Sequence, residues 1–442
     1  MKEKIEIIGY WNINSDINRY SGTLVCKDDE ILLTLLDCEI DIKLPFVVHG
    51  ISIIGVKYTL YDCFVSKSRT TTSGIGTIEI SAFYCFIGEN LTESSLLFES
   101  AFLKISSLNE WVDLSGFVDL INEGDELSVF YKNMEPISFF KDDNVEFLIY
   151  FQRTSPFMLL PKHNCTINQE TLIQIKHKSK FSFDEYWKYV VAIKSFLTLA
   201  YFSEPHIQEI KLFQDENMIV LFYVGQNKGN FKDKRHRKNF LFTYDLIKND
   251  FNLIFNKWKE LNVLIEPVIN VLQESFSNRN LIIENKFLNL MQAIETFHRR
   301  RRNNEKESKE IFNSRLEQIF DLCLPEHRDW LKERISYKNE PDLDYRLTNL
   351  FKEIDTSLIK YLFKNERDII LDSKYSRNYY THYGKELEKK VLRGKELYYL
   401  TERLKIFLLI LLLQETEIGK DKVNIIVKDA SIFLFNNLIY EE

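Results

Sequence analysis

The residues with the clearest chemical potential lie in the C-terminal third of the chain, where Arg377, Asn378 and His382 form an Arg-Asn-x3-His segment. A histidine with an ordinary pKa near neutrality can accept and return a proton at physiological pH. An arginine can hold a phosphate through charge-assisted hydrogen bonds and stabilise the added charge of a transition state. Asn378 is small and polar and can orient either group. These residue types predict metal-independent RNA cleavage by the ribose 2′-OH.

The spacing of this segment constrains how it can work. On an ideal helix, Arg377 and His382 point about 140° apart. A working site therefore needs a helix end here, which Gly384 can supply, or a second copy of the segment from a partner subunit. The same spacing also occurs in proteins where the arginine forms an ion pair and the histidine simply lies near a helix end.

A second polar pair, Glu295 and Arg299, precedes this segment by about 80 residues. The two residues are four positions apart, which is one helical turn, and alone they make an ordinary ion pair. We expect both to approach Arg377 and His382, so that the four side chains form one composite site.

Basic residues cluster immediately after this pair, in His298–Arg302, where four arginines follow one histidine. Side chains on a helix advance by about 100° per residue, so we expect that the four arginines cannot all be buried or paired. One interpretation is a solvated helix end, where cations suit the negative end of the helix dipole. The other is that Arg300, Arg301 and Arg302 guide the RNA backbone towards the site.

The first 265 residues predict a β-dominated region. Runs rich in β-branched and aromatic residues alternate with turn clusters, which is typical of an antiparallel sandwich or open barrel. A capping box at Ser182–Glu185 predicts a helix start. We interpret residues 1–265 as one region with subdomains at 1–178 and 179–265. The expected strands include 51–65, 77–86, 127–131, 145–151, 209–213, 218–224 and 240–243.

Beyond residue 265, apolar residues recur at helical spacing to the end of the chain. Residues 266–442 therefore predict an up-and-down α-helical bundle, and the whole chain predicts an α+β multidomain protein. We expect helices over 281–300, 306–322, 326–337, 342–353, 358–383, 395–415 and 422–439.

Taken together, Glu295-x3-Arg299 and Arg377-Asn378-x3-His382 resemble the paired motifs of the HEPN superfamily of ribonucleases. The resemblance implies a helical bundle that dimerises, with one metal-independent site at the interface. Arg377, Asn378 and His382 would be its core, and Glu295 and Arg299 its supporting pair. The departure is Arg299, where lysine is common in the family; the charge is kept.

The N-terminal half resembles that of ApeA-type anti-phage HEPN proteins in the order of its apolar patterns. The matching segments are Ile51–Gly55, Tyr58–Cys63, Phe86–Gly88 and Leu108–Trp111. The resemblance implies that this half senses a phage-derived trigger or restrains the nuclease. Infection would then release cleavage of host RNA, with tRNA loops as the expected target, and abort phage production.

The composition of the chain limits which other classes of protein it can belong to. A formal net charge of −7 does not mark the whole chain as a nucleic-acid binder, although basic runs at 176–180, 232–238 and 298–302 are local exceptions. The six cysteines lack metal-ligand spacing, so we expect no metal and no cofactor. The longest apolar run, 406–413, falls well short of the roughly 20 residues that span a bilayer. We therefore expect a cytoplasmic protein with no membrane partner.

Two alternatives stay open. One is a HEPN bundle without catalysis, which serves dimerisation or nucleotide binding beside a ligand-binding β-sandwich. The other is a carbohydrate- or protein-binding β-sandwich with a helical oligomerisation tail. The first predicts that His382→Ala changes no RNA cleavage, and the second predicts that Arg377 has no function.

Overall fold

The computed structural model describes residues 5–430 except 14–17, 28–29, 38–45, 70–75, 124–125, 155–165, 227–238, 279, 336–337 and 364–365. The chain divides into two compact units. The first comprises residues 1–197 and 205–252, and the second comprises residues 198–204 and 253–442. Residues 198–204 therefore belong to the second unit, although the chain returns to the first unit at residue 205.

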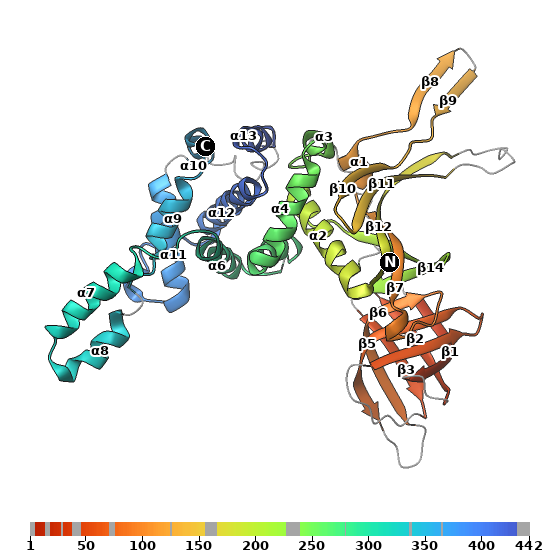
Figure 1. Cartoon of the computed structure of the whole chain (residues 1–442), viewed down its shortest axis with the longest axis horizontal. Helices are drawn as coiled ribbons and strands as arrows, with labels where there is room; N and C mark the ends of the chain where they lie inside the picture. Colours follow the sequence, from red (N-terminus) through yellow and green to blue (C-terminus); the bar gives the residue numbers. More distant parts are fainter. Residues whose placement is uncertain are drawn as a thin grey trace. The chain divides into compact units, whose positions relative to one another are not determined.

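Six antiparallel strands of the first unit close into a barrel, because β5 pairs with both β4 and β6 (Figure 1). Alternate side chains point inwards, as the strand period requires, and Trp11 is fully buried among them. Gly50 leaves the space that the Trp11 ring fills, since a Cβ there would lie 2.2 Å from it. The strands are β1 (Ile5–Ile13), β2 (Tyr20–Lys27), β3 (Glu30–Leu36), β4 (Phe46–Ser52), β5 (Lys57–Arg69) and β6 (Thr77–Ile87).

The same sheet continues from β6 through six more strands in the order β14, β13, β7, β12, β11 and β10. A separate hairpin pairs β8 with β9. The prediction of an antiparallel β-rich half is confirmed, with a closed barrel. The bounds are β7 (Leu97–Ile105), β8 (Phe117–Glu123), β9 (Glu126–Tyr131), β10 (Ile137–Lys141), β11 (Val145–Thr154), β12 (Asn168–Ser182), β13 (Ile207–Gln214) and β14 (Asn217–Tyr223), with short helices α1 (Leu108–Val112) and α3 (Tyr244–Ile247).

The structure of the first unit tests two predictions directly, the capping box at the start of a helix and the strand at 240–243. The capping box is confirmed, because Ser182 and Glu185 exchange backbone and side-chain hydrogen bonds of 3.3 Å at the start of α2 (Phe183–Tyr201). The strand predicted at 240–243 is wrong. Phe240, Leu241 and Phe242 are buried in succession, which a strand with one exposed face does not allow, and the Trp111 indole donates to the carbonyl of Phe242.

The predicted strand at 51–65 is also divided, since a turn at residues 53–55 separates β4 from β5. This turn needs a left-handed residue, which Gly55 provides with a φ of 85°. Ile53 and Ile54 are exposed in the turn. The apolar pattern of residues 51–65 is continuous in the sequence, so it did not indicate that the chain reverses direction within it.

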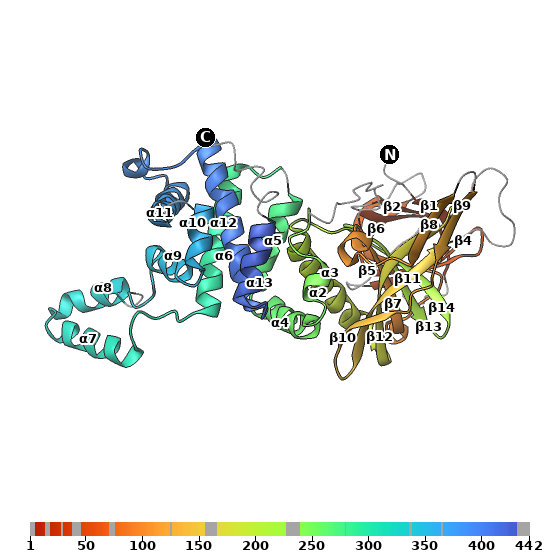
Figure 2. The ribbon, with the colours of Figure 1, turned by 90° about the horizontal axis from the view of Figure 1, so that it is seen from above.

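The second unit is helical (Figure 2). The apolar run of α12 is buried on all sides at residues 406–413, which explains why its sequence has no polar face. The helices are α4 (Phe251–Leu264), α5 (Glu266–Ser277), α6 (Ile283–Arg301), α7 (Lys309–Asp321), α8 (Pro325–Ile335), α9 (Leu343–Phe351), α10 (Thr356–Phe363), α11 (Glu366–His382), α12 (Gly394–Glu415) and α13 (Lys420–Asp429).

The helix predicted over 358–383 corresponds to α10 up to Phe363 and to α11 from Glu366, and residues 364–365 between them lie outside the described residues. Buried apolar residues lie on both α10 and α11. The helix predicted over 422–439 corresponds to α13 up to Asp429, and its expected remainder from 431 onwards lies outside the described residues.

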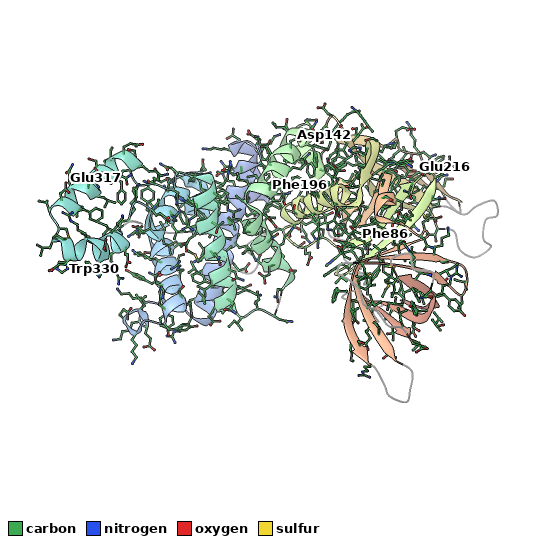
Figure 3. All side chains as sticks on the ribbon, turned by 60° about the horizontal axis from the view of Figure 1, so that its bottom comes forward. Phe86, Asp142, Phe196, Glu216, Glu317 and Trp330 are labelled. Carbon is green, nitrogen blue, oxygen red and sulfur yellow. The ribbon has the colours of Figure 1, made fainter. Side chains whose placement is uncertain are left out.

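The pair α7 and α8 extends away from the rest of the helical unit, as the positions of Glu317 and Trp330 show (Figure 3). Neither helix has a buried residue. In the described part of the chain, no helix combines the length and the apolar character needed to cross a membrane.

Candidate functional site

Helices α6 and α11 pack against each other and bring Glu295 together with Arg377. The Arg377 Nε lies 3.2 Å from the Glu295 Oε1, and both side chains are about three-quarters buried or slightly less. The Arg377 Nη1 also lies 3.5 Å from the Asn378 Oδ1. Three of the residues predicted for the composite site are therefore neighbours, with one carboxylate holding the guanidinium.

His382 lies at the C-terminal end of α11 and is exposed. The helix stops there because Tyr383 adopts a left-handed conformation with a φ of 51°, one residue before Gly384. Arg377 and His382 belong to the same helix, so their side chains diverge by about 140°. Within the residues that the structure describes, the exposed His382 makes no hydrogen bond or ion pair.

Arg299 does not join Arg377. Its Nη2 lies 3.3 Å from the Glu340 Oε2, and both side chains are largely exposed. Arg299 is therefore held at the segment between α8 and α9, one helical turn beyond Glu295.

Each of the three following arginines has a contact, although Arg300 is exposed and contacts a backbone carbonyl in place of a carboxylate. Arg300 donates to the Leu264 carbonyl at 3.0 Å, and Arg301 pairs with Glu415. Arg302 binds Glu353 and Glu415 together, at 2.5 Å and 2.7 Å. The ion pairs of Arg301 and Arg302 compete with phosphate binding, and the RNA-guiding role of the tract stays a prediction. The basic run at 232–238 lies outside the described residues.

A buried polar cluster beside the site was not predicted. His298 is fully buried, with its Nδ1 3.1 Å from the Arg346 Nη1 and its Nε2 3.2 Å from the Asn349 side-chain amide. A guanidinium can only donate, so Nδ1 accepts and the imidazole is neutral. Burial, together with the charges of Arg346 and Arg302, lowers the pKa of His298 to about 4.

Arg346 is the centre of this cluster. It is 3% exposed, its Nε donates to the Pro341 carbonyl at 3.0 Å, and its Nη2 lies 3.6 Å from the Glu340 Oε2. Burial lowers the pKa of Arg346, and Arg299 lowers it further, whereas Glu295 and Glu340 oppose this shift. A charged residue among the buried apolar positions of α9 was the sequence signal that could have identified it.

The charges of the site are unequal. Three guanidiniums, those of Arg299, Arg346 and Arg377, share the two carboxylates of Glu295 and Glu340. The surplus is positive, which suits a phosphodiester. Among the described residues, no group of three or more His, Cys, Asp or Glu side chains is arranged to hold a metal ion.

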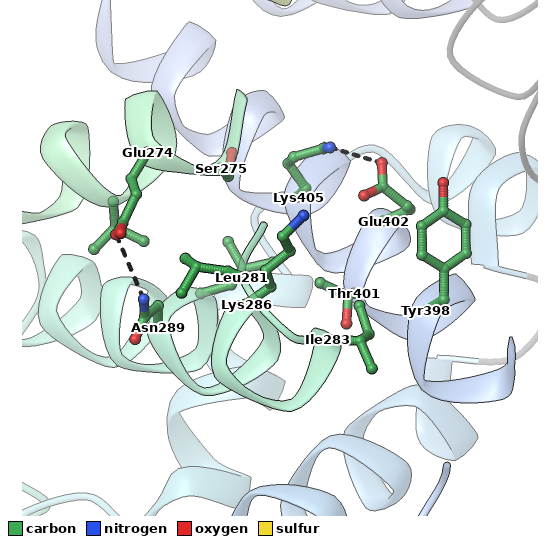
Figure 4. Close-up of a pocket in the computed structure, with 12 residues that line it drawn as sticks. Glu274, Ser275, Leu281, Ile283, Lys286, Asn289, Tyr398, Thr401, Glu402 and Lys405 are labelled. Atoms are coloured by element: carbon green, nitrogen blue, oxygen red, sulfur yellow. Dashed lines mark hydrogen bonds and ion pairs between the residues drawn. The ribbon is translucent and has the colours of Figure 1, made fainter. Parts of the chain in front are cut away.

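A cavity of about 170 Å³ lies elsewhere in the helical unit, between α5, α6 and α12 (Figure 4). Its lining contains the ion pair of Lys405 with Glu402 at 2.7 Å and the contact of Asn289 with Glu274 at 3.5 Å. Neither Arg377 nor His382 lines this cavity. The candidate site on α6 and α11 is therefore separate from this cavity.

Comparison with known protein families shows which family the chain belongs to. The ApeA N-terminal domain 1 family matches residues 6–258. The Apea-like HEPN family matches residues 288–422, which include Glu295, Arg377 and His382. The chain belongs to the ApeA-type HEPN proteins. It is therefore a HEPN-type anti-phage protein, and its HEPN domain is of a kind that is usually a ribonuclease. No curated protein and no solved structure matches the chain.

Proposed function

We propose that the chain is a metal-independent endoribonuclease of anti-phage defence, which cuts host RNA, with tRNA loops as its target. The observation that carries the proposal is the ion pair of Arg377 with Glu295, within a cluster of guanidiniums that outnumber their carboxylates. Glu295 fixes the guanidinium on one side and leaves its remaining N–H groups for a phosphate.

The chemistry follows from the residue types. His382 takes the proton of the ribose 2′-OH or delivers one to the leaving 5′-oxygen. Arg377 stabilises the charge that develops on the phosphate. In-line attack by the 2′-OH breaks the P–O5′ bond, and the products are a 2′,3′-cyclic phosphate and a 5′-OH.

The divergence of Arg377 and His382 on α11 supports a homodimer through the HEPN domain. A phosphate held by Arg377 of one copy would meet His382 of a second copy, with the two Arg-Asn-x3-His segments facing each other. Each composite site would then use both subunits. The N-terminal half would sense a phage-derived trigger and release the site.

The second candidate function is a HEPN module without catalysis. None of the contacts described for the site favours it. Arg377 and His382 are both present, and His382 has free ring nitrogens within the described part of the chain. The nuclease is therefore the better supported function.

The test uses the full chain and a pool of tRNA, with sequencing of the new RNA ends. We expect cleavage that yields 5′-OH ends, that resists EDTA and that is lost in His382→Ala. Substitution of 2′-deoxyribose at the cut site should prevent cleavage, because it removes the nucleophile. Cleavage that requires a metal ion, or that persists in His382→Ala, would contradict the proposal.

A further inference from the structure

Three tyrosines recur at four-residue intervals beside the catalytic histidine proposed above: Tyr375, Tyr379 and Tyr383. Tyr375 and Tyr379 lie on α11 about 20° and 60° from the direction of His382. The histidine therefore shares its helix face with these rings and not with Arg377. Tyr383 follows directly and is 66% exposed.

The exposed Tyr383 ring has support on one side. Its centroid lies 5.5 Å from that of Tyr379 and 6.5 Å from that of Tyr380, both in edge-to-face geometry. Tyr380 is buried. The ring is therefore held in place while much of its surface stays open to solvent, which is the arrangement that base stacking requires.

The chain after α11 returns along the helix. The Tyr380 hydroxyl donates to the Leu392 carbonyl at 2.8 Å, and the Leu392 N–H donates to the Ser376 Oγ at 3.1 Å. These two bonds fix the segment that connects α11 with α12, including the short helix η3 (Lys385–Leu387) (Figure 2).

This returning segment adds cations to the tyrosines. The Lys390 Nζ lies 4.8 Å from the centre of the Tyr375 ring. The Arg393 guanidinium lies 5.3 Å from that of Tyr379 and donates to its hydroxyl at 3.1 Å. Residues 385–396 hold five basic and three acidic side chains, so the surface carries a net positive charge.

We propose that Tyr375, Tyr379, Tyr383, Lys390 and Arg393, here called the aromatic strip, bind a single-stranded segment of RNA beside the scissile phosphate. An unpaired base stacks on Tyr383, and backbone phosphates lie along Lys390 and Arg393. The substrate is single-stranded because a base within a duplex has no free face for the ring. The inference rests on the proposed function for its ligand class.

The strip is also better placed for this task than the arginine tract. Arg301 and Arg302 are bound to Glu415 and Glu353 inside the bundle, whereas the Arg393 side chain is 55% exposed and its nearest carboxylate, that of Glu388, is 3.8 Å away. A phosphate can replace that weak pairing at little cost.

The test measures binding in the full-length His382→Ala background, so that no probe is cut. The probes are a fluorescent 12-nucleotide single-stranded RNA of mixed sequence and the duplex of the same sequence. We expect the single strand to bind more tightly. Tyr383→Ala should weaken its binding about fivefold or more, whereas Tyr383→Phe should retain it. Tyr10→Ala, which removes an exposed tyrosine from the barrel, is the matched control and should change nothing.

Salt dependence tests the cations separately. Lys390→Gln should reduce the slope of log affinity against log salt concentration by about 0.7, the value for one phosphate contact on a single strand. Equal binding of Tyr383→Ala and its parent, or equal affinity for duplex and single strand, would overturn the inference. A Tyr383→Ala chain that loses its dimer would also overturn it and assign the ring to a contact between copies.

The outcomes separate this inference from the proposed function. If the wild-type chain binds single strands through Tyr383 but cuts no RNA, the proposed nuclease fails and the strip stands. If the wild-type chain cuts RNA and Tyr383→Ala cuts it with unchanged KM, the strip fails and the nuclease stands.

Discussion

Arg377 and Glu295 are 82 positions apart in the sequence, and the Nε of the arginine lies 3.2 Å from the Oε1 of the glutamate. This pair connects α11 with α6 in the HEPN domain. It gives the arginine a fixed direction, and the proposed nuclease would depend on this pre-orientation, because fixed charges are a large part of how enzymes stabilise charge in a transition state.

Replacement of Glu295 tests that orientation. We expect Glu295→Gln to lower kcat about 10- to 100-fold, an effect of about 1.4–2.7 kcal/mol, because the neutral amide holds the guanidinium less firmly. The KM should change less than kcat. Steady-state cleavage of a defined RNA measures both constants. Glu340→Gln is the control, since Glu340 contacts Arg299 and Arg346 but has no contact with Arg377 among the described residues. Equal losses in the two variants would mean that Glu295 acts only through net charge.

Mixed dimers test the composite site. Neither Arg377→Ala nor His382→Ala should cleave RNA alone, because each lacks one half of both sites. When the two chains are mixed and allowed to exchange subunits, one site per mixed dimer regains an intact arginine and an intact histidine. We therefore expect activity to return. A mixture that forms dimers and stays inactive would place both residues of each site in one subunit.

The buried His298 predicts a pH-dependent stability. Its pKa falls from an ordinary value of 6.5 to about 4 in the folded chain. Between these values the unfolded chain binds the extra proton, so its contribution to stability is complete above about pH 6.5 and is lost as the pH falls to about 4. The whole effect is about 3 kcal/mol.

Urea unfolding at pH 7 and at pH 4.5 measures this effect. His298→Gln should lose less stability between the two pH values than the wild-type chain does. His327→Gln is the matched control, because the His327 side chain is 61% exposed, and its pH profile should follow the wild type. Parallel profiles for all three chains would show that His298 does not contribute.

We expect replacement of Arg302 to change the stability of the fold and not the binding of RNA. Its guanidinium forms ion pairs with Glu353 and Glu415, whose side chains are 26% and 10% exposed. We expect Arg302→Gln to lower the free energy of unfolding by about 2 kcal/mol, because the largely buried Glu353 loses its guanidinium partner and the more deeply buried Glu415 keeps only Arg301. Arg300→Gln removes a single contact to a backbone carbonyl and should stay within about 0.5 kcal/mol of wild type. Urea midpoints compare the two variants, and equal midpoints would contradict the assigned difference.

Some of the site could be predicted from sequence because its residues carry local information. The spacing of Glu295 and Arg299 indicates a helix, and the angle between Arg377 and His382 follows from helix geometry alone. The partners of Arg302 could not be foreseen, because Glu353 and Glu415 lie on other elements. Helix geometry describes where a side chain points, but not what another segment places in front of it.

Two errors have the same origin. The strand expected at 240–243 depended on residue types, whereas the structure buries Phe240, Leu241 and Phe242 together. The cluster of His298 and Arg346 was missed because a buried arginine needs hydrogen-bond acceptors from several segments at once. Such residues resemble surface charges in the sequence, unless they interrupt an apolar helix face as Arg346 does in α9.

The short segment 198–204 has an evolutionary consequence. It belongs to the helical unit, and its Phe202 ring packs 5.0 Å from Phe276 and 5.5 Å from the Lys405 Nζ. A recombination event joined after the first matched family ends at residue 258 and before residue 276 would separate Phe202 from both neighbours. The incoming HEPN domain would receive the corresponding ring from a foreign N-terminal half. We therefore expect that relatives which exchange their N-terminal halves retain an aromatic residue at this position, so that Phe202 acts as a compatibility requirement between the two inherited parts.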